Sequence, residues 1–312
     1  MTKKQKASSK PAAKPPLNPQ SMEQMMRDLT RLLNDQQFES IEEANQFVQE
    51  LMAGGQPIPT TEPRSDLDRA QEIIYQAAEA RSRTQVIKLA RRALMISPDC
   101  ADGYVLLAET AAETPAEAWA FYEAGVKAGQ RALGKTFEED KGHFWGILET
   151  RPYMRARLGL ANILWEMGRL EEAADHMAEM LVLNPNDNQG VRQLYITLLL
   201  ELDDTRRLEK LIKQYPDDWS AAWKYSRALY EFRKQGPGAK AEALLSDAIA
   251  YNPHVPAYLL GKKKLPQTLP APYYSPGDEI EAIDYAEDGI RPWTKIEGAL
   301  AWLQEVVAKH NR

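Results

Sequence analysis

Apolar residues recur along most of this chain at the three- and four-residue spacing that places them on one face of an α-helix. Two such stretches lie between residues 21 and 55. Ser40, with Glu43 three residues later, predicts an N-cap for the second stretch, and Gly54 and Gly55 predict its end. We therefore expect an N-terminal helical hairpin over residues 21–55, with apolar faces made by Met22, Met25, Met26, Leu29, Leu32 and Leu33 in one helix and by Ile41, Ala44, Phe47, Val48 and Leu51 in the other.

The segment from about residue 66 to residue 253 repeats its own pattern. Four proline signals punctuate it: ISPD at 96, LNPN at 183, QYPD at 214 and YNPH at 251. The last three prolines are 31 and 37 residues apart, a period typical of helical repeat proteins. The clearest unit, residues 158–185, reads as a helix, a glycine turn, a second helix and a closing proline.

This unit resembles a tetratricopeptide repeat. Small residues at its packing positions let neighbouring helices approach, and apolar residues fill the seam between hairpins. The resemblance implies an all-α fold, a right-handed α-solenoid of about five imperfect repeats. Its packing positions would be Leu160, Ala161, Leu164, Ala173 and Met177 in the clearest unit, and elsewhere Ile73, Ala77, Ala90, Tyr104, Leu107, Ala108, Ala120, Ala124, Leu194, Leu198, Tyr225 and Leu229.

Residues 134–152, GKTFEEDKGHFWGILETRP, interrupt the repeats with glycines and aromatic side chains. Because Phe144, Trp145 and Ile147 are costly to expose, we expect this insertion to pack on the array. The alternative is a loop that shapes a pocket.

The C-terminal segment, residues 254–312, follows a different pattern from the repeats. The words NPHVPAYLL (252–260), SPGDEIEAIDYA (275–286) and WTKIEGAL (293–300) resemble the suppressor-of-tumorigenicity-seven protein family. We expect this segment to cap the array, because a solenoid ends in an atypical unit that covers its last apolar face. Pro256 and Pro266 predict an extended crossing before helices at 278–287 and 293–309, the last with an apolar stripe of Trp293, Ile296, Leu300 and Leu303.

Composition narrows the class of protein. The 312 residues carry a net charge of −6, which disfavours nucleic acid as a partner. Residues 1–20 hold five lysines and four prolines and little apolar area, which predicts a disordered basic tail. The single cysteine, Cys100, suits a reducing, cytoplasmic location. The longest apolar run, LYITLLL at 194–200, is far shorter than the roughly 20 residues of a membrane span.

Motifs that would indicate catalysis or a cofactor are missing from the sequence. The four histidines stand alone at 143, 176, 254 and 310, without metal-ligand spacing. Neither a GxSxG elbow nor a glycine-rich phosphate loop occurs. We therefore predict no cofactor, no metal site and no catalytic residue.

In tetratricopeptide arrays the first helix of each repeat lines a concave groove. Three arginines beside planar polar and aromatic groups at these positions would recognise carboxylates. The alternative is that they pair with acids of the chain's own helices. The groove residues are Arg155, Asn162 and Trp165 in the third repeat, Gln189 and Arg192 in the fourth, and Trp223, Arg227 and Tyr230 in the fifth.

The sequence thus predicts a non-enzymatic scaffold that binds a protein or peptide, acidic or C-terminal, in this groove. The rival is an enzyme, or an accessory subunit of one, with a pocket that the 134–152 insertion and the C-terminal segment form around His143 or His254. The sequence does not indicate an oligomeric state.

Overall fold

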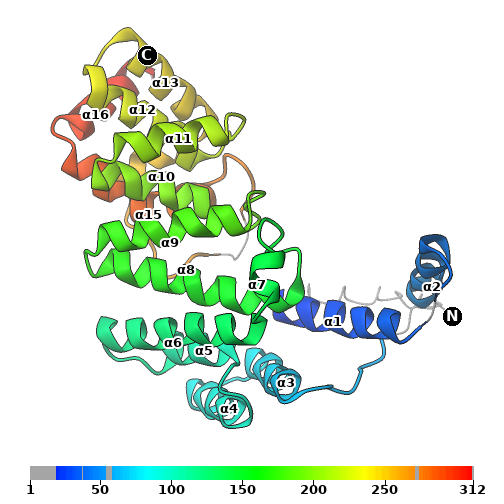
Figure 1. The fold of residues 1–312 in the computed structure, drawn as a ribbon. Helices are drawn as coiled ribbons and strands as arrows, with labels where there is room; N and C mark the ends of the chain where they lie inside the picture. The colour runs from blue at the N-terminus through cyan, green and yellow to red at the C-terminus, as the bar shows by residue number, and fades with distance from the viewer. Residues whose placement is uncertain (1–18, 37, 54–57, 271–273, 311–312) are drawn as a thin grey trace, which may run out of the picture.

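The fold was examined in a computed structural model, which describes residues 19–36, 38–53, 58–270 and 274–310 (Figure 1). All regular elements within these ranges are helices, which confirms the all-α prediction. The predicted disordered tail lies almost wholly outside the described residues, and the first helix begins at Pro19. No helix among the described residues is both long and apolar enough to cross a membrane.

The helices run in this order: α1 (Pro19–Asp35), α2 (Ile41–Ala53), α3 (Asp66–Ala78), α4 (Arg83–Ile96), α5 (Ala101–Thr110), α6 (Pro115–Leu133), α7 (Thr136–Glu139), the 3-10 helix η1 (Leu148–Thr150), α8 (Arg151–Glu166), α9 (Leu170–Leu183), α10 (Val191–Leu202), α11 (Thr205–Gln214), α12 (Ala221–Gln235), α13 (Ala239–Tyr251), α14 (Val255–Leu259), α15 (Glu279–Lys295) and α16 (Ala299–His310).

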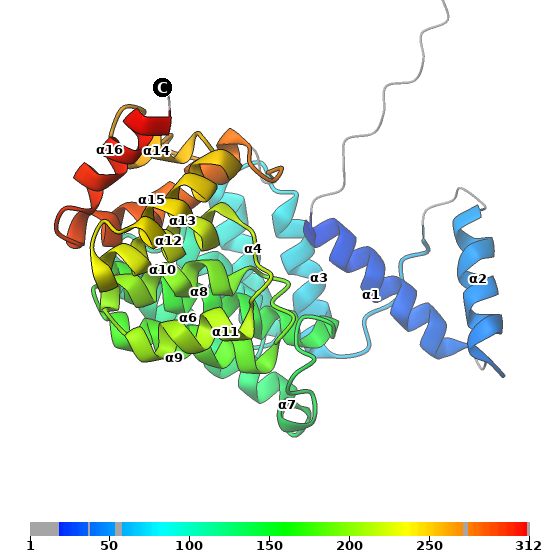
Figure 2. The ribbon, with the colours of Figure 1, turned by 90° about the horizontal axis from the view of Figure 1, so that it is seen from above.

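Helices α3 to α13 pack mainly against their neighbours in the chain, and Figure 1 shows them as a stack of layers. Contacts run from α3 through α4, α5, α6 and α8 to α9 and α10, and on to α12 and α13. In the view from above, α1 and α2 extend from one side of this stack and α14 to α16 cover its far end (Figure 2). Most of the core contacts are therefore between helices that are close to each other in the sequence.

The predicted packing positions of the clearest unit are buried. Leu160, Ala161, Leu164, Ala173 and Met177 are each at most 3% exposed. These side chains are part of one continuous core that reaches from α5 to α16. The proline-based register therefore predicted the buried face correctly in this unit.

The same register was wrong for α6, where Ala120 is exposed. Close approach occurs further along, at Gly125 and Gly129, because α6 is long and meets α8 with its second half. A Cβ on Gly129 would lie 2.8 Å from the Cβ of Tyr153 in α8, so only glycine fits without a shift. The seam between these helices thus needs small residues, but one or two turns later than predicted.

The insertion at 134–152 forms α7 and η1 and packs on the array at Phe144. Phe144 is fully buried, and its ring meets Phe137 and Tyr153 edge-to-face at 5.2 and 6.0 Å. Its backbone N–H and that of Gly142 both donate to the carbonyl of Leu183 at the end of α9. Trp145 and Ile147, in the same turn, are half-buried.

The C-terminal segment packs on α12 and α13. Trp302 of α16 stacks on Phe232 of α12 with ring centroids 4.4 Å apart, and Trp293 of α15 is fully buried beside it. The expected extended crossing at Pro256 was wrong, because Pro256 lies in the first turn of α14, where a missing N–H costs no helical bond. The penultimate helix is also longer than predicted and contains Pro292.

Helix α15 does more than cover the end of the stack. It packs against both α10 and α12, and Tyr285 stacks on Tyr225 of α12 at 5.8 Å. The Nζ of Lys295 donates to the carbonyl of Glu201 at the end of α10. Helix α15 therefore lies across α10 and α12, two of the helices to which the groove was assigned.

Candidate functional site

Two of the predicted groove arginines are neutralised by the chain itself. The guanidinium of Arg155 bonds Asp102 of α5 through Nε at 2.8 Å and Glu23 of α1 through Nη1 at 2.8 Å. Arg192 pairs with Asp187 at 3.0 Å and with Asp218. Burial opposes the charge of Arg155, but the two carboxylates outweigh it and raise its pKa.

On α12 the predicted residues do not line one common surface. Trp223 is fully buried, and the Tyr230 hydroxyl donates to Glu209 at 2.5 Å. Arg227 is half-buried and has no hydrogen bond or ion pair among the described residues. It follows Tyr225 by two residues, about 200° around the helix, so it lies on the side of α12 opposite α15.

Asn162 and Gln189 each hold a buried side-chain oxygen that lacks a partner among the described residues. Gln189 lines a cavity of about 640 Å³ beside α15, together with Arg192, Asp284 and Asp288. Trp165 is buried between two helices, with its Nε1 donating to Glu201 at 2.6 Å. The structure therefore brings Gln189 and Arg192 to one cavity and leaves the other predicted residues elsewhere.

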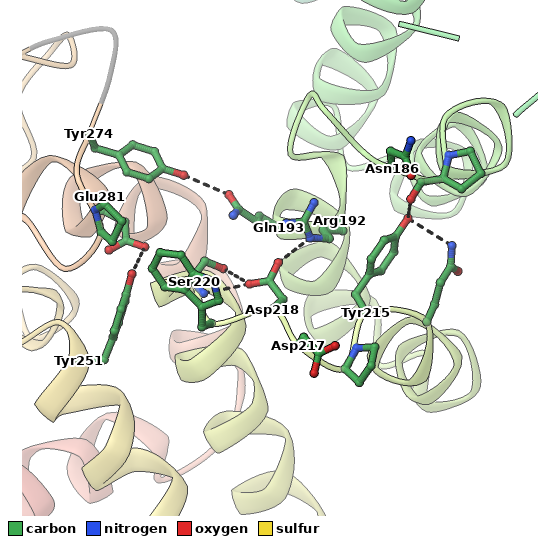
Figure 3. A pocket seen from close by; sticks show the side chains of 15 residues that line it. Asn186, Arg192, Gln193, Tyr215, Asp217, Asp218, Ser220, Tyr251, Tyr274 and Glu281 are labelled. Atoms are coloured by element: carbon green, nitrogen blue, oxygen red, sulfur yellow. Dashed lines mark hydrogen bonds and ion pairs between the residues drawn. The ribbon is translucent and has the colours of Figure 1, made fainter. Parts of the chain in front are cut away.

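A pocket of about 610 Å³ lies where the loops before α10 and α12 meet the segment before α15 (Figure 3). We call it the aromatic pocket. Its indole, Trp219, is 55% exposed and meets Tyr251 edge-to-face at 5.8 Å. The lining consists of four aromatic residues (Tyr215, Trp219, Tyr251 and Tyr274), three prolines (Pro185, Pro216 and Pro276) and the polar residues Asn186, Arg192, Gln193, Gln214, Asp217, Asp218, Ser220 and Glu281.

Hydrogen bonds fix the floor of the aromatic pocket. The carboxylate of Asp218 accepts from Arg192 and from the backbone N–H of Ser220 at 2.9 Å, and the Ser220 hydroxyl caps α12. The Tyr215 hydroxyl donates to the carbonyl of Pro185 at 2.9 Å, which joins two successive loops. Figure 3 shows these side chains pointing toward one another across the loops.

A buried carboxylate, Glu281 of α15, holds the other wall. It is 3% exposed and accepts four hydrogen bonds, all from uncharged donors. Gly277 provides one of them and has φ of +79°, and a Cβ there would lie 2.8 Å from the carbonyl of Tyr251. The four donors are the backbone N–H groups of Ala221 (2.9 Å) and Gly277 (2.7 Å), the Tyr251 hydroxyl (3.1 Å) and the Asn252 amide (3.1 Å).

Most ionisable groups of the aromatic pocket are either uncharged or paired. Burial raises the pKa of Tyr215 to about 12 and raises the pKa values of Tyr251 and Tyr274, so the three phenols stay protonated at neutral pH. Arg192, Asp218 and Glu281 are committed to internal partners. Asp217 is exposed and has no partner among the described residues, and it leaves one negative charge at the rim.

The sequence did not predict this pocket, although the motifs discussed above contain several of its lining residues. We interpreted LNPN, QYPD and YNPH as the ends of repeats, and SPGD as part of a motif that resembles a protein family. In the structure Pro185, Tyr215, Tyr251 and Pro276 from these four words converge on one pocket. The usable signal is that all four words carry a proline, that two of them also carry a tyrosine, and that Trp219 closely follows QYPD.

The rival pocket, formed by the insertion and the C-terminal segment, finds no support in the interactions described. His143 is exposed in the turn that packs against the end of α9. His254 precedes α14, close to Asp278 and Glu279. Within the described part of the chain, no hydrogen bond or ion pair joins the two segments, and no three His, Cys, Asp or Glu side chains gather as metal ligands would.

Comparison with known proteins identifies relatives across most of the chain. The suppressor of tumorigenicity 7 protein-like of Bos taurus is 29% identical over 266 residues, and that of Homo sapiens is 30% identical over 264; each match covers 77% of this chain. The suppressor of tumorigenicity 7 protein of Macaca fascicularis is 29% identical over 269 residues, 76% of this chain. These matches cover 47%, 46% and 49% of the relatives, so the chain spans about half their length.

No solved structure matches this chain. The family model described as ST7 protein matches residues 60–311, which include every helix from α3 to α16 and the whole aromatic pocket. The chain belongs to the ST7 protein family.

Proposed function

We propose that this chain is a non-enzymatic scaffold, a tetratricopeptide-like α-solenoid that binds an extended peptide segment of a partner protein in the aromatic pocket. The observation that carries the proposal is the exposed indole of Trp219 beside three tyrosines and three prolines at the rim of a 610 Å³ cavity. Aromatic grooves of this composition bind proline-containing segments, whose restricted backbone loses little entropy on binding.

The charge at the rim of the aromatic pocket favours one kind of peptide over another. The acidic partner expected from the sequence would need free arginines, but Arg155 and Arg192 are each neutralised by two carboxylates, and only Arg227 stays unpaired. Asp217 favours a basic side chain beside the proline. We therefore propose a proline-containing, basic peptide as the ligand.

We also propose that the chain is not an enzyme and that it resides in the reducing cytoplasm. The Ser220 hydroxyl donates to Asp218 at 2.7 Å, but Arg192 already holds that carboxylate, so it is not a free base. The tyrosines of the aromatic pocket stay protonated. Cys100 is fully buried, and burial raises the pKa of its thiol to about 12, so it is unreactive and suits the cytoplasm.

An array of peptides with proline and lysine or arginine at varied spacing, probed with the full chain, tests this function. Trp219→Ala should lower the affinity of selected peptides by about tenfold, and Asp217→Asn should weaken only the peptides that carry a basic residue. Trp119→Ala, on α6 and outside the pocket, is the matched control. Selection of acidic peptides, or equal effects of the two tryptophan changes, would contradict the proposal.

A further inference from the structure

Helix α1 turns its polar face toward the array. Glu23, Arg27, Asp28 and Arg31 are 5 to 7% exposed, whereas the usual surface helix buries its apolar stripe. Arg27 donates to Tyr75 at 3.2 Å, and Asp28 accepts from the Thr61 hydroxyl at 2.7 Å. Charges of α3 and α8 thus hold α1 by its hydrophilic side.

The apolar face of α1 consequently faces away from the core. Met22 is 47% and Met26 is 38% exposed, and no residue of this face packs on the array's hydrophobic core. Asp35, at the end of the helix, is the one exposed charged residue of α1. An outward helix surface without charge along four turns is typical of a surface that another element covers. The remaining apolar side chains, all half-buried, are Met25, Leu29, Leu32 and Leu33.

Helix α2 extends this surface. It has no buried residue, and Ile41 and Met52 are 76% and 65% exposed. Phe47 meets Phe38, in the loop between α1 and α2, with ring centroids 5.5 Å apart, so an aromatic contact joins α2 to this loop. In both views α2 stands beyond α1, away from the stack (Figures 1 and 2). We call the apolar faces of α1 and α2 together the hairpin surface.

The charge around the hairpin surface decides what covers it. Arg27 and Arg31 are the only basic residues between 19 and 53, and both are buried. A second copy of this chain or an anionic membrane would therefore bring like charges together, whereas a basic helix would not. The exposed acids are Asp35 at the end of α1, which pairs with Arg64, and Glu39, Glu42, Glu43 and Glu50 in or before α2.

We propose that the hairpin surface binds a basic amphipathic helix of a partner protein. The apolar side of that helix would cover Met22, Met26 and Ile41, and its lysines or arginines would face the acids of α2. This interaction does not depend on the aromatic pocket, whose lining residues all lie between 185 and 281. It gives the chain a second docking surface.

The probe is a labelled helical peptide of about 18 residues with leucine at the spacing of one face and lysine on its flanks. Its control carries glutamate in place of lysine. Against the full chain, fluorescence anisotropy should show the lysine peptide binding at least about tenfold more tightly. The double change Met22→Gln and Met26→Gln should lower the affinity for the lysine peptide by about tenfold. Met95→Gln, on α4 and 87% exposed, should leave this affinity unchanged.

Three results would overturn the proposal. Equal binding of the lysine and glutamate peptides would remove the charge argument. A concentration-dependent dimer that the two methionine changes abolish, measured by analytical ultracentrifugation, would assign the surface to a second copy. Binding to phosphatidylcholine or phosphatidylserine vesicles that the same changes abolish would assign it to a membrane. Unchanged thermal melting of the variant shows that it is folded, because these methionines lie outside the core.

Discussion

The two helices that flank the array, α1 and α15, attach to it by opposite chemistry. Helix α15 buries Ala282, Tyr285 and Trp293 against α12 and its neighbours and turns Asp284 and Glu287 outward. Helix α1 buries Glu23, Arg27 and Arg31 and turns its methionines outward. One is held by apolar area and the other by ion pairs.

The difference matters because the two kinds of contact are not equally strong. Burial of large apolar side chains contributes about 1.5–3 kcal/mol each, whereas ion pairs lose most of their Coulomb gain to desolvation. Helix α15 should therefore be an integral part of the fold, and α1 a separable attachment. The separable helix is the one whose free face is apolar.

The largest effect should follow Trp293→Ala. The ring is fully buried, its Nε1 donates to the Tyr285 hydroxyl at 3.0 Å, and it lies 6.1 Å from Trp302. Its removal should lower the free energy of unfolding by about 3–5 kcal/mol. Urea denaturation measures this, with Trp219→Ala as the exposed control that should change it by less than about 1 kcal/mol. A similar loss in both would break the comparison.

Glu281→Gln should have the next largest effect. The carboxylate accepts four hydrogen bonds while buried, and a glutamine NH₂ would face donors on one side. The expected loss is about 2–3 kcal/mol of unfolding free energy, measured by thermal melting. Glu287→Gln, exposed on the same helix, should be nearly neutral. A neutral Glu281→Gln would show that α15 does not depend on this cluster.

Arg155→Met should act on α1 alone. It leaves Glu23 and Asp102 without their common partner, but α1 can move away and return both groups to water. The cost to global unfolding should therefore stay below about 1–2 kcal/mol, while amide protection of α1 is lost in hydrogen exchange. Arg131→Met, which removes an exposed pair with Asp99, is the control. A global loss of protection would make α1 as integral as α15.

The last effect depends on pH and concerns Asp288 of α15, which is half-buried and lines the cavity of about 640 Å³ beside this helix. Burial raises its pKa to about 6, helped by the charges of Glu287, Asp284 and Glu166 and opposed by Arg291. Because the folded-state pKa exceeds the ordinary 3.8, the stability that the protonated form provides is lost as pH rises through about 6.

Asp288→Asn should accordingly raise the unfolding free energy by about 1–2 kcal/mol at pH 7.5 and leave it unchanged near pH 4. Thermal melting across this range measures the difference. Glu305→Gln, an exposed acid of α16, is the control for the loss of one surface charge. A gain that is independent of pH would contradict the assignment to Asp288 ionisation.

Local pattern predicted the helices well and their partners poorly. The N-cap at Ser40 was confirmed, since its hydroxyl accepts from the N–H of Glu43, and the repeat spacing placed Leu160 and Met177 in the core. Both features depend on residues close in sequence. The face that α1 buries depends instead on Arg155, far along the chain, and the amphipathic pattern of α1 alone does not show this partner.

The candidate site shows the same limit. The arginines were identified as carboxylate readers by type and spacing, but their acids come from other helices and loops, and no periodicity shows which acid reaches them. The aromatic pocket needs the loops before α10 and α12, the end of α13 and the segment before α15 to meet, although Tyr215 and Tyr251 already stood at marked turns. The residues of the site could be picked out in the sequence, but the sequence did not show that they meet in space.

Hydrogen exchange of the unaltered chain, followed by mass spectrometry at low and high sodium chloride, shows whether α1 is separable and α15 integral. We expect α15 to exchange at the rate of α10 and α12, and salt to leave the exchange rates of all three helices unchanged. Helix α1 should open separately, about tenfold or more faster in high salt, because screening weakens the ion pairs that hold it. If α1 and α15 exchange at the same rate with the same salt dependence, the account is wrong.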